Sequence, residues 1–161
     1  MEVQQRNTKA PTRLFPKWQP SPLDSIHKLS LAISQSRNSS SIGVGLLIQN
    51  CKGEVLAATC RWEQKNLNPL YIAASMMRVA LLFCQSISFF KLYVECNFAE
   101  LMDLLISNRI SSLEVAWILE DINLIKGSFA FISFHNIPLW GNRAALALST
   151  AAEKEEEAIV W

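Results

Sequence analysis

Residues 42–62 place the strongest constraint on the fold of this sequence, because two apolar stretches there are joined by a short polar connection. The stretches are IGVGLLIQN, residues 42–50, and EVLAATCRW, residues 54–62. Gly53 lies in the connection and can adopt the positive φ that a tight turn requires. The pattern predicts a β-hairpin, and therefore a sheet with an antiparallel start.

A further strand is predicted before the hairpin. Leu29, Leu31 and Ile33 alternate with polar or small residues, which is the period-two pattern of a half-buried strand. The segment before it is rich in prolines, too many for a helix or a central strand, at positions Pro11, Pro16, Pro20 and Pro22. We expect residues 1–25 to form a disordered basic lead-in and order to begin near Ile26.

Helices and strands alternate after the hairpin. Residues 70–88 have apolar residues at helical spacing, and Met76 and Met77 are expected in the core. The remaining patterns predict a strand around Tyr93, helices at 98–107 and 111–126 with Trp117 in the core, a strand at 129–136 and a helix ending near Ala152. The order β-β-β-α-β-α-α-β-α predicts one α/β domain at 26–152, a mixed five-stranded sheet with helices on both faces, followed by an acidic tail at 153–161.

Composition and cysteine spacing exclude several classes of protein. Fifteen Lys and Arg against fourteen Asp and Glu give a net charge of +1, which identifies no charged partner. The cysteines, Cys51, Cys60, Cys84 and Cys96, match no zinc or redox spacing and indicate reduced thiols in an intracellular protein, nuclear or cytoplasmic. No apolar run has membrane-spanning length, so no membrane partner is expected, while organelle targeting by the acid-poor N-terminus stays open.

Four stretches of the sequence carry recognisable motifs in a fixed order. IGVGLLIQNCKGEVLAA has a G-x-G strand followed by a hairpin, and WQPSPLDSIHKLSLAIS precedes it. These two stretches are similar to the N-G-E-V-L-A hairpin and to the W-x-P-P-P…K-L-N-x-D-G-A opening of the plant ribonuclease H-like domains. NPLYIAASMMRVALLFCQSISFFKLYVECN resembles the A-E-x-x-A helix and the V-E-S-D strand, and FISFHNIPLWGNRAALALSTAA the closing A-D-x-L-A segment. The stretches follow the family order from about Trp18 to Ala152, and they imply the ribonuclease H fold.

The resemblance also implies a chemistry that can be compared residue by residue. Type 1 ribonucleases H hydrolyse the RNA strand of an RNA–DNA hybrid, and their carboxylates hold two magnesium ions. Magnesium requires charged oxygen ligands. The positions matching the four family carboxylates are Ala32, Ala73, Asn97 and Leu146. We therefore expect no catalytic residue, no bound metal and no other cofactor.

An alignment error of one residue cannot restore the missing carboxylates. No Asp or Glu occurs between residues 25 and 53, between 64 and 94, or between Asp121 and Glu153. Glu95 lies close to the expected centre, but its family counterpart is an ordinary neighbour of a metal ligand. One carboxylate does not hold two magnesium ions.

Three other polar residues have a structural interpretation that we prefer to a functional one. Asn97 and Glu100 have the spacing of a capping box, so Asn97 is expected to start a helix at Phe98. Glu95 is expected to be solvated. His135 is expected to be a polar strand end and not a general base, since it stands one place before the family's histidine; His27 is uninformative.

Trp140, Asn142 and Arg143 are the candidate nucleic-acid-binding residues. A cation at the start of a helix attracts phosphate, and an indole ring can stack on a base. Packing of Trp140 against the sheet is the competing interpretation.

The leading hypothesis is a ribonuclease H-like pseudoenzyme that at most binds RNA–DNA hybrid or another nucleic acid weakly. One alternative is a protein-interaction domain, or a decaying retroelement-derived domain, that binds no nucleic acid. A second alternative is a residual RNA–DNA hybrid endonuclease. The sequence identifies no protein partner and no oligomeric state.

Overall fold

The computed structural model describes residues 25–35, 40–64, 68–109, 113–155 and 159–160. Residues 1–24 of the predicted lead-in lie outside the described residues, as do residues 156–158 and 161 of the predicted tail. The elements follow the predicted order, with a short 3-10 helix, η1, before the last helix and a two-residue strand, β6, after it.

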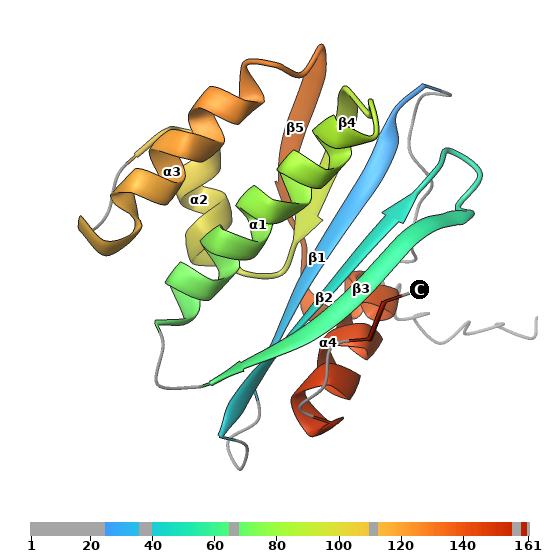
Figure 1. Cartoon of the computed structure of the whole chain (residues 1–161), viewed down its shortest axis with the longest axis vertical. Coiled ribbons are helices and arrows are strands. Elements are labelled where there is room, and N and C mark those ends of the chain that lie inside the picture. Colours follow the sequence, from blue (N-terminus) through green and yellow to red (C-terminus); the bar gives the residue numbers. More distant parts are fainter. Residues whose placement is uncertain (1–24, 36–39, 65–67, 110–112, 156–158, 161) are drawn as a thin grey trace, which may run out of the picture.

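One mixed sheet forms the centre of the fold (Figure 1). Its order is β5-β4-β1-β2-β3-β6. β1 pairs antiparallel with β2 and parallel with β4, so the hairpin half and the helix–strand half meet at β1. The strands are β1 His27–Gln35, β2 Ser41–Gln49, β3 Val55–Gln64, β4 Lys91–Cys96, β5 Phe131–Asn136 and β6 Ile159–Val160. The mixed sheet of five main strands is confirmed, and Gly53 has the positive φ, 80°, expected in the hairpin turn.

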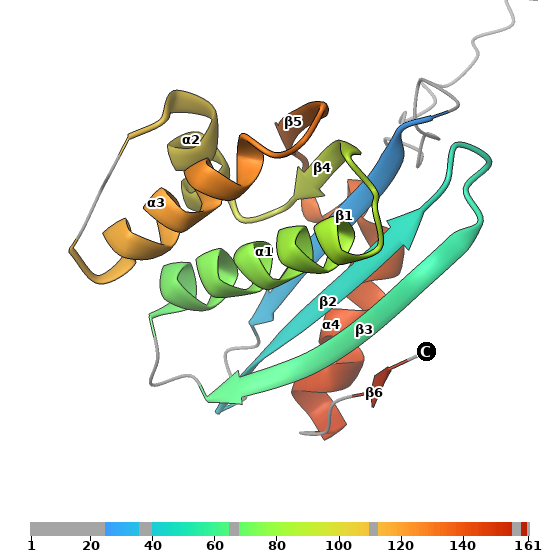
Figure 2. The ribbon, with the colours of Figure 1, turned by 45° about the horizontal axis from the view of Figure 1, so that its top comes forward.

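Helices cover both faces of the sheet, as predicted. Figures 1 and 2 show α1, α2 and α3 on one face and α4 on the other. The helices are α1 Pro69–Ser86, α2 Ala99–Ser107, α3 Leu113–Lys126, the short η1 Leu139–Gly141, and α4 Arg143–Glu155. α4 therefore extends three residues beyond the predicted boundary at Ala152, into the predicted tail.

The apolar alternation of β1 assigns its residues to two cores. Leu29, Leu31 and Ile33 belong to the large cluster under α1, α2 and α3, whereas Ala32 belongs to a small cluster under α4. Every residue of β2 is buried, because helices or neighbouring residues cover both of its faces. The hairpin strand IGVGLLIQN is therefore the most enclosed strand of the sheet.

The two core predictions for helices have different outcomes. Met76 and Met77 are 5 % and 0 % exposed, as expected. Trp117 is 51 % exposed, so its core assignment is wrong. The buried face of α3 consists of Val115, Ile118, Leu119 and Ile122, and a residue at position 117 lies off that face at helical spacing.

Helix α1 is long and apolar enough to span a membrane by length and composition alone, the single such helix in the described residues. Half of its apolar window is buried inside the fold, and core helices pass the same criterion. The finding is therefore weak evidence for a membrane. The rest of the helix exposes apolar side chains such as Val79 and Phe83 at the surface.

Gly45 in β2 allows α4 to approach the sheet. A Cβ atom at this position would lie 2.1 Å from the carbonyl oxygen of Ala145 and 2.6 Å from the backbone nitrogen of Ser149. Both are backbone atoms of α4, which cannot move without moving the helix. The glycine of the G-x-G strand is thus required by a close helix–sheet contact.

We expect Gly45→Ala to lower the free energy of unfolding by at least about 1–3 kcal/mol, because overpacking forces α4 away from β2. Urea unfolding followed by circular dichroism measures the change. Gly127→Ala is the control, since the added Cβ would lie 3.3 Å from the carbonyl oxygen of Leu124 and needs only a small adjustment. Equal stability of Gly45→Ala and the parent protein would contradict the close packing of α4.

Candidate functional site

The ends of β1 and β4 are joined by the side chain of Asn97. Leu31 pairs with Cys96 in the parallel register, so Asn97, the residue after Cys96, lies next to the end of β1. Asn97 Oδ1 accepts a hydrogen bond from the Ile33 backbone N–H at 3.0 Å, and Asn97 Nδ2 donates to the Ile33 carbonyl at 3.1 Å. Both polar atoms of the amide are therefore used by the backbone of β1.

The capping role predicted for Asn97 is wrong. Helix α2 begins at Ala99, and its N-cap residue is Phe98, whose side chain gives the first turn no cap hydrogen bond in the described part of the chain. The Phe98 backbone N–H instead meets Cys96 Sγ at 3.4 Å. The capping-box spacing is real, but the backbone of β1, 64 positions away, binds the Asn97 amide in place of the helix.

The positions matched to the family carboxylates lie on two faces of the sheet. Ala32 is fully buried under α4, and Leu146 of that helix packs against the same small cluster. Asn97 bonds to Ile33, the residue after Ala32, so these three positions lie in one neighbourhood. Ala73 is fully buried in the large cluster, on the α1 side. The correspondence of the four positions to the family carboxylates stays a prediction.

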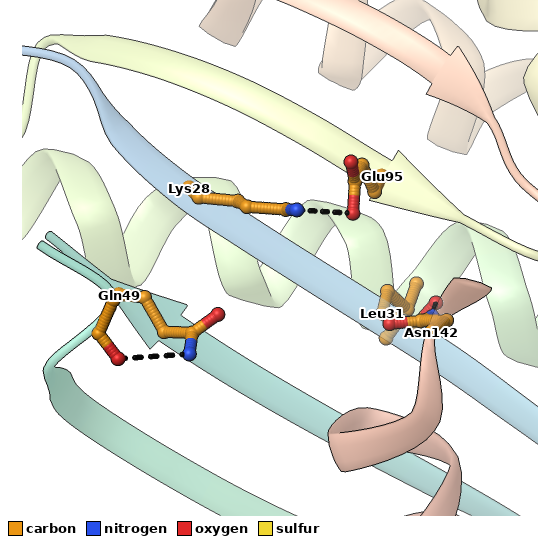
Figure 3. A network of polar contacts seen from close by, with 6 residues as sticks. Lys28, Leu31, Gln49, Glu95 and Asn142 are labelled. Carbon is orange, nitrogen blue, oxygen red and sulfur yellow. Dashed lines mark hydrogen bonds and ion pairs between the residues drawn. The ribbon is translucent and has the colours of Figure 1, made fainter. Parts of the chain in front are cut away.

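Asn142 fixes the start of α4 on the central strand (Figure 3). Its Nδ2 donates a hydrogen bond to the Leu31 carbonyl at 2.9 Å, and the residue is only 4 % exposed. Among the three candidate nucleic-acid-binding residues, Asn142 therefore has a structural contact, whereas Arg143 is exposed and Trp140 is 56 % exposed. The packing of Trp140 against the sheet, the competing interpretation, is wrong.

Lys28 and Glu95 form an ion pair beneath the surface, with Lys28 Nζ 2.9 Å from Glu95 Oε2 (Figure 3). Lys28 is 2 % and Glu95 8 % exposed, so the prediction that Glu95 is solvated is wrong. The register explains the contact, since Lys28 pairs with Tyr93 and Ser30 with Glu95 on the same face. Sequence analysis missed Lys28, although its parity in β1, on the face opposite to the large cluster, was the available signal. Removing one partner of such a buried pair typically costs about 3–5 kcal/mol.

A stacked aromatic pair lies beside this ion pair. The Tyr93 and His135 rings are parallel, with centroids 3.9 Å apart, and His135 Nε2 lies 2.9 Å from Ser133 Oγ. Burial lowers the pKa of His135, Glu95 opposes this effect, and Lys28 adds to it. Burial, together with Glu95, raises the pKa of Tyr93. His135 is the penultimate residue of β5, in agreement with the strand-end prediction.

His27, about which the sequence was uninformative, has a ring nitrogen whose hydrogen-bonding capacity is not satisfied among the described residues. Its ring stacks on Phe89 at 3.7 Å, and its buried Nδ1 atom has no hydrogen-bond partner among the described residues. Burial lowers its pKa. Burial therefore favours the neutral form of the ring.

The cysteines are free thiols, with Cys60, Cys84 and Cys96 buried. Burial raises the pKa of Cys84 and of Cys96 to about 12, which keeps these thiols protonated and unreactive. Across the described ranges, no group of three or more His, Cys, Asp or Glu side chains is arranged to hold a metal ion.

Several solved structures that are similar to this chain are ribonucleases H. The N-terminal RNase H domain of a Mycobacterium tuberculosis protein, determined as a fusion with maltose-binding protein, has a TM-score of 0.69 and 12% identity over 81% of this chain and 95% of its own. RNase H1 from Halobacterium salinarum has a TM-score of 0.64 and 12% identity over 81% and 96% of the two chains. LC11-RNase H1, isolated from compost and solved with an RNA/DNA hybrid, has a TM-score of 0.69 and 16% identity over 80% and 97%.

At these identities the likeness shows the fold alone, and the fold class is ribonuclease H-like. The sequence itself matches a family model described as reverse transcriptase-like over residues 31–152. This is more than half of the chain, and the protein belongs to that family. No curated protein matches the sequence.

The two lowered histidine pKa values predict that acid destabilises the protein. An unfolded histidine has a pKa of about 6.5. Because the folded pKa of His27 and of His135 lies below it, the unfolded state binds more protons, and stability falls as the pH decreases through about 6.5. Urea unfolding at pH 7.5 and 5.5, roughly one unit on each side of that value, measures the loss.

A histidine NMR titration separates the two contributions. In Glu95→Gln, the His135 pKa should fall further, because the carboxylate that raises it is gone while Lys28 keeps its charge. The His27 pKa should not move, since burial alone lowers it. A His135 pKa that rises in this variant would contradict the described contacts.

Asn97→Ala should lower the free energy of unfolding by about 1–3 kcal/mol, because it leaves a part-buried N–H and carbonyl of Ile33 without partners. Asn97→Asp should also destabilise, since a carboxylate cannot donate to the Ile33 carbonyl. Asn136→Ala, at the exposed end of β5, is the control and should change stability by less than about 0.5 kcal/mol. Chemical denaturation of the three variants measures these differences.

Proposed function

We propose that this chain is a ribonuclease H-like module that binds nucleic acid and does not cleave it. The observation that carries the proposal is the content of the four matched positions. Ala32 and Ala73 are fully buried and offer no oxygen ligand, and Leu146 is apolar. Asn97 uses both amide atoms to bind the backbone of Ile33.

Glu95 does not replace the missing ligands. Its carboxylate is paired with Lys28 at 2.9 Å, so its charge is already compensated by a neighbouring ammonium group. A pair of magnesium ions needs several charged oxygens on one open face. The residues present do not fit such a pair, and we derive no hydrolytic step for this chain.

Binding is assigned to the exposed residues at the start of α4. Arg143 is exposed at the N-terminus of the helix, and the half-exposed indole of Trp140 lies in the preceding η1. A guanidinium group can contact a phosphate, and an indole can stack on a base. LC11-RNase H1 was solved with an RNA/DNA hybrid, which makes a hybrid the natural first probe.

The evolutionary origin and the cellular location of the protein are part of the same proposal. The match to a reverse transcriptase-like family supports a retroelement-related origin, and the motif resemblance supports a plant one. Buried free thiols are compatible with an intracellular protein, nuclear or cytoplasmic.

The decisive experiment incubates the purified full chain with a labelled RNA–DNA hybrid and magnesium or manganese. We expect no cleavage above the background of a buffer control, with either metal. Glu95→Gln should give the same result as the parent protein. Robust turnover that disappears in Glu95→Gln would overturn the proposed lack of catalysis.

The same hybrid, without metal, tests binding. We expect Arg143→Gln to weaken binding and to reduce the salt slope by about one counterion, and Trp140→Ala to cost about 1–3 kcal/mol of binding free energy. Arg109→Gln and Trp117→Ala remove an exposed guanidinium and an exposed indole elsewhere on the surface and should have no effect. Absence of salt-dependent binding by the parent protein would overturn the binding half of the proposal.

A further inference from the structure

Strand β3 is the outer long strand of the sheet and is paired on its outer side over a short length. Among the described residues, β6 pairs antiparallel with Thr59 and Cys60, Val160 facing Thr59 and Ile159 facing Cys60. β3 itself has ten residues. The pairing shows that the outer edge of β3 accepts an extended antiparallel segment. Unpaired backbone groups along such an edge favour the addition of another strand.

An apolar groove of about 280 Å³ lies next to this edge, between β3 and helix α1. β3 contributes Ala57, Ala58 and Thr59 to the lining, and β2 contributes Leu46. The helix contributes Met76, Val79, Ala80 and Phe83. Among the described residues, no charged side chain lines the groove, and Thr59 is the one polar residue of the lining.

Large apolar side chains are exposed on α1, where they line the groove, and at the start of β3. Val79 and Phe83 of α1 are 47 % and 43 % exposed, and Val55 and Leu56 at the start of β3 are 57 % and 46 % exposed. This is the half of α1 that does not enter the core. Exposed apolar residues that gather in one patch mark interaction surfaces, whereas single exposed apolar residues are common and have no such meaning.

We propose that the β3 edge and this groove form a strand-addition site for an extended apolar segment of a partner protein. Backbone hydrogen bonds to an edge strand provide affinity, and pockets for alternate side chains provide specificity. In an added strand, every second side chain points to the α1 side and meets the groove. The lack of charge in the lining favours an apolar peptide over a nucleic acid.

The orientation and the residue types follow from β6. It is antiparallel to β3, and its sequence, Ile159–Val160, consists of β-branched residues. The partner segment continues this pairing along β3, or replaces β6, with branched or aromatic residues at alternate positions. The site is independent of the nucleic-acid binding proposed above, since it uses neither Trp140 nor Arg143.

The test uses the full chain and a fluorescent peptide without net charge, which has branched residues at alternate positions and contains the Ile-Val pair of β6. Fluorescence anisotropy should show saturable binding with a Kd on the order of 100 μM or tighter. Val79→Glu and Phe83→Glu place a charge in the groove at exposed positions and should weaken binding by about tenfold or more. Leu124→Glu, at a position 78 % exposed on α3, is the matched control and should leave the Kd unchanged.

A second variant tests the edge. Val160→Pro removes the β6 N–H at the residue paired with Thr59 and should release the chain's own strand, so the peptide should bind more tightly to this variant. A control peptide with prolines in place of its isoleucine and valine should not bind.

Three outcomes would overturn the proposal. The first is no saturable binding to either the parent protein or Val160→Pro. The second is binding that is indifferent to Val79→Glu and Phe83→Glu. The third is uptake of the protein by phosphatidylcholine vesicles, lost in Val79→Glu, without any peptide binding, which would assign the apolar surface to a membrane.

Discussion

The parallel pairing of β1 with β4 is the contact on which the rest of the structure depends. It joins the antiparallel hairpin half of the sheet to the half in which helices and strands alternate. Polar side chains hold this seam at two places: Lys28 with Glu95 along its length, and Asn97 with Ile33 beyond its last register pair. On the opposite face, apolar side chains of both strands enter the large core. The seam is thus closed by apolar packing on one face and by directional contacts on the other face and at its end.

The amide of Asn142 adds a third directional contact, between the start of α4 and the Leu31 carbonyl. Together with Gly45, which allows the helix to approach β2, it positions α4 over the hairpin strands. In this fold the ends of β1 and β4 and the start of α4 meet at one place. Here two amides that bond to the β1 backbone, and the apolar residues Ala32 and Leu146, occupy that place. A carboxylate at position 97 would still accept the hydrogen bond from the Ile33 N–H, but it would repel the Ile33 carbonyl oxygen, to which the Asn97 amide donates.

The outcomes for individual residues show which patterns in the sequence can be trusted. The hairpin, helix α1 and the methionine pair were predicted because periodicity and turn residues act over a few positions. The cap at Asn97 was wrong, because an equally good partner came from a strand distant in sequence. The predicted solvent exposure of Glu95 was wrong for a similar reason, since nothing in the neighbouring sequence indicates that Lys28 will lie beside it. Trp117 was misplaced because its helix buries a neighbouring stripe.

Sequence alone determined the order of elements, the hairpin turn at Gly53, the apolar faces and the absence of acidic residues from long windows of the chain. These properties depend on local conformation and composition, so they do not depend on how the helices and strands pack against one another. Tertiary structure decided which polar groups meet, which side chains are enclosed and where an apolar surface stays open beside β3. Those contacts join residues that are far apart in the chain, so only the assembled sheet and its helices could specify them.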